Sequence, residues 1–291
     1  MLKVSIIMPA YNEANAITAL LKHIHSVLEK TYSKNDYEII VVDDGSTDTT
    51  AQQAHDAGAT VIRHPYNIGN GSAIKTGLRA AQGEKVLLMD ADGQHSPDYI
   101  PQLLAPLNEY EMAVGARKGY THTPLHRKCA NAFYNIFASY LVNRKIEDLT
   151  SGFRAIKAGV AKKFIYLLPN SFSYPSTLTM ALSRCGYSIA YVPIHLKPRL
   201  SKSKISLFSD GVRFIIIMMK IAAFFNPLRI FIPVSLLCLG TGLGHATFKI
   251  LLRNEKYTGF SMMLITTGIM IFLMGLIAEQ IAQLRLERSE E

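Results

Sequence analysis

Residues Lys85 to Asp92 read KVLLMDAD, an unbroken apolar run that ends in two acids. Such a run is typical of a strand covered on both faces of a parallel sheet. Alternation along the strand puts the carboxylates of Asp90 and Asp92 on one side, where they repel each other without a cation. Hard oxygen ligands suit Mg²⁺ or Mn²⁺, and Gln94 can add a neutral oxygen. The stretch predicts a divalent metal site, although an isolated pair of acids is more often a solvated turn.

The flanking sequence alternates between buried strands and amphipathic helices. Strands are predicted over residues 3–9, 37–48, 59–64 and 111–117, and helices over residues 14–29, 49–57 and 70–81. This alternation predicts an α/β domain with a mostly parallel sheet. Ligands of such sheets bind beyond the carboxyl ends of the strands. We therefore expect Pro9–Glu13, Asp43–Asp44, Asp90–Asp92 and Arg117 to converge on one cleft.

Two long apolar stretches lie near the C-terminal end of the sequence. Residues 230–252 contain no acid and no Arg, and residues 260–278 contain no charged residue. At about 1.5 Å per residue, each is long enough for the roughly 30 Å hydrocarbon core of a bilayer. We predict transmembrane helices over residues 228–252 and 259–281, followed by a cytoplasmic tail at 282–291. A buried hairpin of a soluble protein is the alternative.

The 291 residues carry a formal net charge of +9, and much of it precedes these helices. Between His195 and Ile230 the chain has seven Lys or Arg residues and one acid. Basic residues favour the cytoplasmic side, so we expect a multi-pass protein of the cytoplasmic (inner) membrane with residues 1–200 in the cytoplasm. Residues 201–227 are predicted to form a juxtamembrane interfacial amphipathic helix, with a third span as the alternative. No aromatic-and-basic motif points to nucleic acid.

Five short motifs occur in order along the front domain. They are PAYNE (9–13), VVDDGSTD (41–48), NIGNGSAIKTGL (67–78), MDADGQH (89–95) and LTSGFR (149–154). Together they resemble glycosyltransferase family 2, and more narrowly the polyprenyl-phosphate glycosyltransferases of the dolichyl-phosphate mannose synthase group. The resemblance covers about residues 3–204. It implies a GT-A-type (Rossmann-like) domain followed by the interfacial helix and the two-helix transmembrane hairpin, with a nucleotide-sugar as donor.

The resemblance assigns roles to residues on the donor side. The nucleotide-sugar is expected at Pro9, Tyr11, Glu13, Val42, Asp44, Asp90, Ala91, Asp92 and Arg117. Asp90, Asp92 and Gln94 would hold Mg²⁺ or Mn²⁺, and Asp92 is also a catalytic candidate. The glycines of the third motif, Gly69, Gly71 and Gly77, would permit close backbone approach near the donor. Strand packing remains the alternative for Pro9 and Val42, and simple solvation for Arg117.

On the acceptor side, an anionic lipid phosphate needs cationic positioning more than deep activation. The candidates are Arg127, Arg154, Arg199, Lys202 and Lys204. The run from Arg199 to Lys204 resembles the family's Arg followed by Gly-Ser-Lys, but it lacks the Gly and is one residue shorter. Either lysine can therefore fill the family's role, and Lys202 can instead bind headgroups. Asp148, with Arg127 and Arg154, is a catalytic candidate, either as a general base or as the group that orients Arg154 or another acceptor-side group.

These features predict an inverting, metal-dependent transferase that moves one hexose from a UDP- or GDP-sugar to undecaprenyl or dolichyl phosphate, for cell-envelope glycans or protein glycosylation. The bilayer is a further partner, and glycines at 240, 242, 244, 268 and 275 allow either a homo-oligomer or close packing within one hairpin. A processive polysaccharide synthase is an alternative, opposed by the absence of Trp for a QxxRW motif. A catalytically silent membrane scaffold is opposed by the retained acids, and a soluble transferase by the apolar hairpin.

Overall fold

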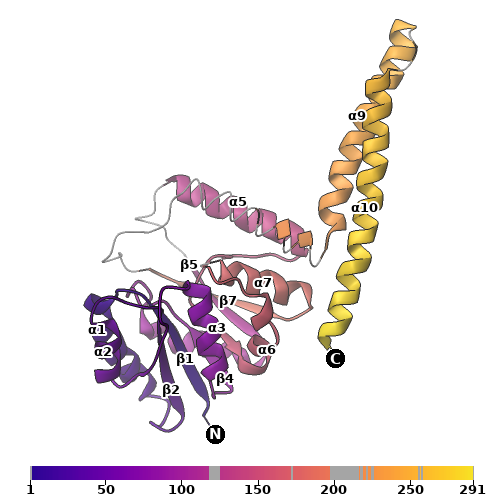
Figure 1. Cartoon of the computed structure of the whole chain (residues 1–291). Helices are drawn as coiled ribbons and strands as arrows, with labels where there is room; N and C mark the ends of the chain where they lie inside the picture. Colours follow the sequence, from indigo (N-terminus) through magenta and orange to yellow (C-terminus); the bar gives the residue numbers. More distant parts are fainter. Residues whose placement is uncertain are drawn as a thin grey trace. The chain divides into compact units, whose positions relative to one another are not determined.

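The computed structural model describes residues 2–117, 125–171, 173–196, 216, 219–220, 222–223, 226–254, 256 and 258–290, without the side chains of 125–130, 252 and 285–290. The chain divides into two compact units, Met1–Gly211 and Val212–Glu291. Figure 1 follows the course of the chain through both units. Each unit is a separate body with its own packing.

A seven-stranded sheet in the order β3-β2-β1-β4-β6-β5-β7 forms the centre of the first unit. The strands are β1 (Val4–Ala10), β2 (Tyr37–Asp43), β3 (Thr60–Arg63), β4 (Lys85–Leu88), β5 (Met112–Arg117), β6 (Arg154–Lys157) and β7 (Ile189–Ile194). All neighbouring pairs are parallel except those of β6, which runs antiparallel to β4 and β5. The predicted α/β fold with a mostly parallel sheet is confirmed. The pattern did not reveal β6 and β7.

Helices connect these strands and cover the sheet (Figure 1). They are α1 (Ala14–Leu28), α2 (Thr50–Asp56), α3 (Asn70–Ala80), α4 (Ile100–Leu104), α5 (Leu125–Val142), α6 (Ala158–Lys163) and α7 (Tyr174–Arg184), with single-turn 3-10 helices η1 (Pro97–Tyr99), η2 (Ala105–Asn108) and η3 (Ile165–Leu167). The apolar periodicity of α1 puts Ile17, Leu21 and Ile24 fully inside, against a β1 strand that is buried along its whole length. Each such side chain contributes about 1.5–3 kcal/mol by burial.

Glycines of the third motif let α3 approach its neighbours within the protein. A Cβ at Gly77 would overlap the side chain of Ile7 on β1, and a Cβ at Gly71 would overlap the Pro169 carbonyl oxygen. Gly69 faces the carbonyl of Asn170 in the same way and has φ +123°, a conformation that favours glycine. Packing against other parts of the chain is therefore one reason for glycine at these positions. The expected approach to a donor stays a prediction.

The second unit is a hairpin of two long helices, α9 (Leu228–Arg253) and α10 (Gly259–Glu290). Both are long and apolar enough to cross a membrane, by length and composition. A Cβ would lie 2.7 Å from Leu239 at Gly268 and 2.6 Å from Phe231 at Gly275, so glycine allows the helices to pack closely. A Cβ at Gly240 or Gly244 would have no heavy atom within 4 Å.

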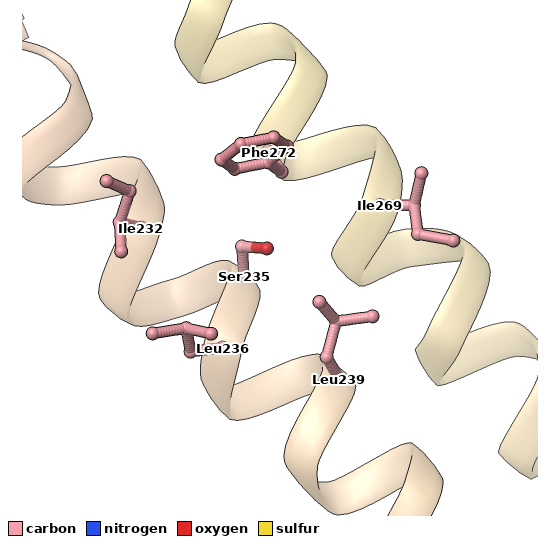
Figure 2. Close-up of a pocket in the computed structure, with 6 residues that line it drawn as sticks. All are labelled: Ile232, Ser235, Leu236, Leu239, Ile269 and Phe272. Atoms are coloured by element: carbon pink, nitrogen blue, oxygen red, sulfur yellow. The ribbon is translucent and has the colours of Figure 1, made fainter.

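The hairpin also contains an apolar groove between its helices. Figure 2 shows its lining, which consists of Ile232, Ser235, Leu236 and Leu239 on α9 with Ile269 and Phe272 on α10. The one hydroxyl in this lining is satisfied within the hairpin, because Ser235 Oγ donates to the Gly268 carbonyl at 2.8 Å. The groove surface is therefore hydrocarbon in character.

Two predicted boundaries differ from the structure. β4 ends at Leu88, so Asp90 and Asp92 lie in the turn after the strand and not on one side of it. α10 continues to Glu290, through the range predicted as a tail. Most of the predicted interfacial helix at residues 201–227 lies outside the described residues, and Arg199, Lys202 and Lys204 lie outside them as well.

Candidate active site

Strand register brings several polar segments to one edge of the sheet. Ala10 of β1 pairs with Asp43 of β2, and Ile7 of β1 pairs with Leu88 of β4. Because β6 is antiparallel, its first residue, Arg154, pairs with Leu88 at the same edge. The acidic turns after β2 and β4 and the loop before β6 therefore meet there. This is the convergence expected at the carboxyl ends of parallel strands.

The turn after β4 holds the predicted metal-binding residues. Asp90, Asp92 and Gln94 are all half-buried, and the Gln94 N–H donates to Asp92 Oδ1 at 3.1 Å. Asp90 rests against the backbone of Gly152, where a Cβ would lie only 2.6 Å from Asp90 Oδ2. Residue 152 must therefore lack a side chain for Asp90 to keep this position.

These donors fit a hard divalent cation. Among the described residues, no group of three or more His, Cys, Asp or Glu is placed to bind a metal. Two carboxylates and a neutral amide oxygen suit Mg²⁺ or Mn²⁺, and they leave coordination positions that substrate phosphate oxygens commonly fill. The donor types, and the support of Asp90 by Gly152, are compatible with a metal–diphosphate site.

Arg117, at the end of β5, is clamped by Asp148. Its Nε donates to Asp148 Oδ2 and its Nη2 to Asp148 Oδ1, each at 2.7 Å, and Nη2 also donates to Thr150 Oγ1. The Arg117 side chain is 20% exposed and that of Asp148 3%. A bidentate pair of this kind fixes the plane of the guanidinium. The alternative of a merely solvated Arg117 is therefore wrong.

Asp148 is poorly suited to act as a base. Burial raises the pKa of its carboxyl, but hydrogen bonds and the charge of Arg117 outweigh burial, so the net pKa is lowered. Its Oδ1 also accepts the N–H groups of Thr150 and Ser151, each at 3.2 Å. The guanidinium that Asp148 holds by hydrogen bonds is that of Arg117, whereas the sequence had offered Arg154 as one of the groups it could orient.

Arg154 lies beneath the site with no exposed surface. Its guanidinium donates to the carbonyl oxygens of Ser151 and Pro175 and to Thr179 Oγ1. Burial lowers its pKa, and the charges of nearby Asp148 and Asp90 act in the opposite direction. In this structure no surface of Arg154 is open to an acceptor phosphate. Arg154 instead ties the loop before β6 to α7.

His95 is a site residue that the sequence pattern did not single out. It is 6% exposed, and its ring lies 5.0 Å from the ring of Phe153. Burial lowers the pKa of His95 to about 4, with Asp92 acting to raise it and Arg117 to lower it. The imidazole is therefore neutral at pH 7. Its position directly after Gln94 in the MDADGQH motif was the available signal.

The two acids after β2 hold neighbouring loops. Asp43 Oδ1 accepts the Ser46 N–H at 3.0 Å. Asp44 accepts the N–H groups of Ile68 and Gly69 at 3.0 and 2.8 Å, and its Oδ1 lies 2.8 Å from His64 Nδ1. Asp44 therefore shapes the loop at residues 67–69 in addition to any contact it makes with a nucleotide.

The remaining donor-side candidates lie at the end of β1 and beside it. Pro9 and Val42 are buried strand partners, so strand packing explains their burial, and contact with the nucleotide stays a prediction. Tyr11 and Glu13 are half-buried in the turn before α1, and the Glu13 N–H donates to Thr50 Oγ1 at 2.9 Å. Ala91 is buried between the two acids of the metal turn. On the acceptor side, α5 contains Arg127, but its side chain is outside the described part of the chain.

Comparison with known proteins matches both units. The profile of glycosyl transferase family 2 matches residues 5–165, and that of the GtrB C-terminal hairpin matches residues 226–284. The chain is 34% identical to the dolichol-phosphate mannosyltransferase of Pyrococcus furiosus, over 55% of this chain and 48% of that protein. It is 30% identical to the undecaprenyl-phosphate 4-deoxy-4-formamido-L-arabinose transferase of Proteus mirabilis, over 59% of this chain and 56% of that protein. The chain thus spans about half the length of these relatives.

Solved structures share the fold of the first unit. Glucosyl-3-phosphoglycerate synthase from Mycobacterium tuberculosis, crystallised with Mn²⁺, UDP and glucosyl-3-phosphoglycerate, aligns with a TM-score of 0.61 at 20% identity, covering 76% of this chain and 80% of that one. The GT-A-type prediction is confirmed. The two apolar helices and the hairpin match together indicate a membrane protein.

Proposed function

Because the chain belongs to glycosyl transferase family 2, we propose that it transfers one hexose from a UDP- or GDP-sugar to a polyprenyl phosphate. The product is a polyprenyl-phosphate sugar for cell-envelope glycans or protein glycosylation. One observation carries the proposal: a single chain joins a family 2 domain to a GtrB-type hairpin. Membrane attachment suits a transferase whose acceptor is itself embedded in the bilayer. The names of the two relatives agree with a lipid-phosphate acceptor.

In the proposed reaction, an oxygen of the lipid phosphate attacks the anomeric carbon opposite the nucleotide. The new carbon–oxygen bond forms as the bond to the nucleoside diphosphate breaks, so the configuration inverts. A phosphate monoester is already anionic at neutral pH, so the attack requires no general base. This agrees with an Asp148 carboxyl whose pKa is lowered and whose oxygens are both engaged by Arg117.

The residues around the metal turn have separate tasks. Asp90, Asp92 and Gln94 would hold Mg²⁺ or Mn²⁺, which when bound neutralises charge on the departing diphosphate. Arg117, fixed in plane by Asp148, is suited to pair with the diphosphate oxygens. Tyr11, Glu13 and Asp44 are proposed to contact the base and ribose, next to the loop that Asp44 holds.

The proposed setting is the cytoplasmic face of the membrane. The basic residues between His195 and Ile230 favour the cytoplasmic side by the positive-inside rule. Arg199, Lys202 and Lys204 in that segment are proposed to receive the acceptor phosphate. We also propose that each hairpin helix crosses the membrane, with the first unit on the cytoplasmic side.

Product extraction tests this function. Membranes containing the full chain are incubated with radiolabelled nucleotide-sugars and either undecaprenyl or dolichyl phosphate. We expect label in a chloroform-soluble product that releases the free sugar on mild acid treatment. Label in an insoluble polymer would indicate a processive synthase, and label in a water-soluble product would indicate a small acceptor. No incorporation with any donor would favour a silent scaffold.

The metal role is tested with Asp92→Ala. We expect kcat to fall by about 100-fold or more, because an electrostatic contact to the leaving group is lost. The thermal unfolding midpoint should change little, since Asp92 is only half-buried. EDTA should abolish wild-type turnover and Mn²⁺ or Mg²⁺ should restore it. Full activity in EDTA would contradict this role.

A further inference from the structure

Tyr66 lies in the loop between β3 and α3, and its side chain is 67% exposed. A single exposed ring is common on protein surfaces, and what distinguishes Tyr66 is its position. Its loop leaves the sheet at Arg63, which pairs with Asp43, and Asp43 pairs with Ala10. The loops that follow β1, β2 and β3 therefore start side by side at one edge of the sheet.

Ser46 links these three loops. Its Oγ accepts the N–H of Asn12 in the turn after β1, and its carbonyl oxygen accepts Nη2 of Arg63 at the end of β3, each at 2.9 Å. Asn12 stands between Tyr11 and Glu13, which are proposed to contact the base and ribose of the donor. The loop that carries Tyr66 therefore borders this part of the site.

Asp44 holds that loop on both sides of Tyr66. Its Oδ1 lies 2.8 Å from Nδ1 of His64, two residues before the tyrosine. Its two carboxylate oxygens accept the N–H groups of Ile68 and Gly69, which follow the tyrosine, at 3.0 and 2.8 Å. The backbone that carries the ring is thus fixed in advance, so little conformational freedom is lost when the ring meets a ligand.

Gly45 brings the backbone of Tyr66 against the loop after β2. A Cβ at Gly45 would lie 2.8 Å from Tyr66 Cα, and the φ of +75° at this position also favours glycine. The Tyr66 side chain therefore starts beside the residue that follows Asp44. The Asp44 side chain is only 4% exposed, so little of its own surface is open to a ligand, whereas the Tyr66 ring is open.

We propose that the Tyr66 ring stacks on the base of the nucleotide. A base has two flat π faces and a polar edge, and carboxylates can bind only its edge. A phenol ring held beside these acids supplies the contact to a face. Because every base has such faces, Tyr66 adds affinity without choosing between UDP and GDP. This role rests on the proposed nucleotide-sugar donor.

Tryptophan fluorescence tests the stacking directly. The chain contains no Trp, so Tyr66→Trp introduces a single indole that can stack as the phenol does. The full chain in detergent with Mn²⁺ is titrated with UDP, with GDP and with ribose 5-diphosphate, which lacks a base. We expect at least one of the two nucleotides to cause a saturable loss of emission, because the base lies on the indole. Ribose 5-diphosphate should leave the emission unchanged.

The matched control is Tyr110→Trp. Tyr110 is 38% exposed and precedes β5, at the opposite edge of the sheet from Arg117. Its emission should stay constant with all three ligands. Equal loss of emission in Tyr66→Trp and Tyr110→Trp would overturn the proposal, because it would report light absorption by the nucleotide. Constant emission of Tyr66→Trp while calorimetry detects bound nucleotide would overturn it as well.

Tyr66→Ala measures what the ring contributes to binding. We expect the dissociation constant for the nucleotide, measured by calorimetry, to rise about tenfold, because stacking of one base on an aromatic ring typically contributes this factor or more. Tyr66→Phe keeps the ring and should bind as wild type. Unchanged affinity of Tyr66→Ala would contradict stacking. An equal loss of affinity for ribose 5-diphosphate would also contradict it, by showing that the substitution only disturbs the loop.

Product extraction separates this role from the proposed function. Base-dependent loss of Tyr66→Trp emission, in a chain whose wild type forms no polyprenyl-phosphate sugar, would contradict the transfer reaction alone. Formation of that product by a Tyr66→Ala protein with wild-type nucleotide affinity would contradict stacking alone. If the wild type bound neither UDP nor GDP, both the stacking and the proposed donor would be wrong.

Discussion

At Asp148, burial and ion pairing act on the same carboxyl in opposite directions, and ion pairing with Arg117 prevails. The lowered folded-state pKa means that the charge stabilises the protein above the unfolded value of 3.8. This contribution is lost as the pH falls through the folded-state pKa. The ionised pair is therefore intact throughout the pH range in which enzymes of this kind are assayed.

Asp148→Asn tests this balance through stability. We expect a loss of about 3 kcal/mol in the free energy of unfolding at pH 7, because the half-buried Arg117 is left without its counter-charge. The difference from wild type should stay constant from about pH 5 to 8 and shrink below about pH 4. Thermal unfolding of the full chain in detergent over a pH series measures it. If the stability difference between wild type and Asp148→Asn already shrinks between pH 7 and 6, the Asp148 carboxyl titrates in that range, as a general base would.

Gly152 is a second single residue on which the site depends, because it fixes the position of the Asp90 side chain. A Cβ at residue 152 would lie 2.6 Å from Asp90 Oδ2, so Gly152→Ala must displace the carboxylate. We expect the Mn²⁺ concentration for half-maximal turnover to rise about tenfold, a typical effect of disturbing the support of a metal ligand.

Gly159→Ala is the matched control for this prediction. Gly159 lies in α6 with no heavy atom within 4 Å of the added Cβ, so its metal dependence should equal that of wild type. If Gly152→Ala and Gly159→Ala show the same metal dependence, metal binding by the Asp90 carboxylate does not require glycine at residue 152.

At the scale of elements, glycines decide how closely α9 and α10 pack. Gly268→Ala puts a Cβ 2.7 Å from Leu239 Cγ and 3.1 Å from its backbone nitrogen, so the helices must separate. We expect a loss of about 1–3 kcal/mol, the usual cost of overpacking, measured by thermal unfolding in detergent. Gly244→Ala has open space around the new methyl and should be neutral. Equal stability of the two variants would argue against close packing at Gly268.

The elements themselves were largely predictable, and the exceptions have physical causes. β1, α1 and α3 follow from apolar runs and periodicity that burial requires. β4 was extended too far, because Met89 and Ala91 are as buried in the turn as they would be in a strand. β6 was missed because its four residues begin with Arg154, whose burial depends on carbonyl partners far along the chain.

At the scale of the whole molecule, we propose that different segments of the chain bind the nucleotide-sugar donor and the lipid-phosphate acceptor. We expect the double variant Arg199→Ala, Lys204→Ala to lose turnover of polyprenyl phosphate about 100-fold or more, since both cations proposed for the lipid phosphate are removed. The dissociation constant for the nucleotide, measured by calorimetry, should stay within about twofold of wild type, because a group making no contact with a ligand contributes little to its affinity.

An equal loss of nucleotide binding would show that these cations belong to the donor side. The control is Lys30→Ala, which changes an exposed residue in the turn after α1 and should alter neither measurement. Because the two measurements are independent, the assignment of sides can fail without affecting the assignment of the reaction.

The sequence alone determined the sheet-and-helix class, the two apolar helices and the acids after β4, because burial and strand ends leave local patterns that one segment displays. Tertiary structure decided which partners these groups have. Asp148 clamps Arg117, Arg154 is buried against carbonyls, and Gly152 seats Asp90. Such pairings join residues from different strands and loops, and only the antiparallel β6 and the fold around it bring them within contact distance.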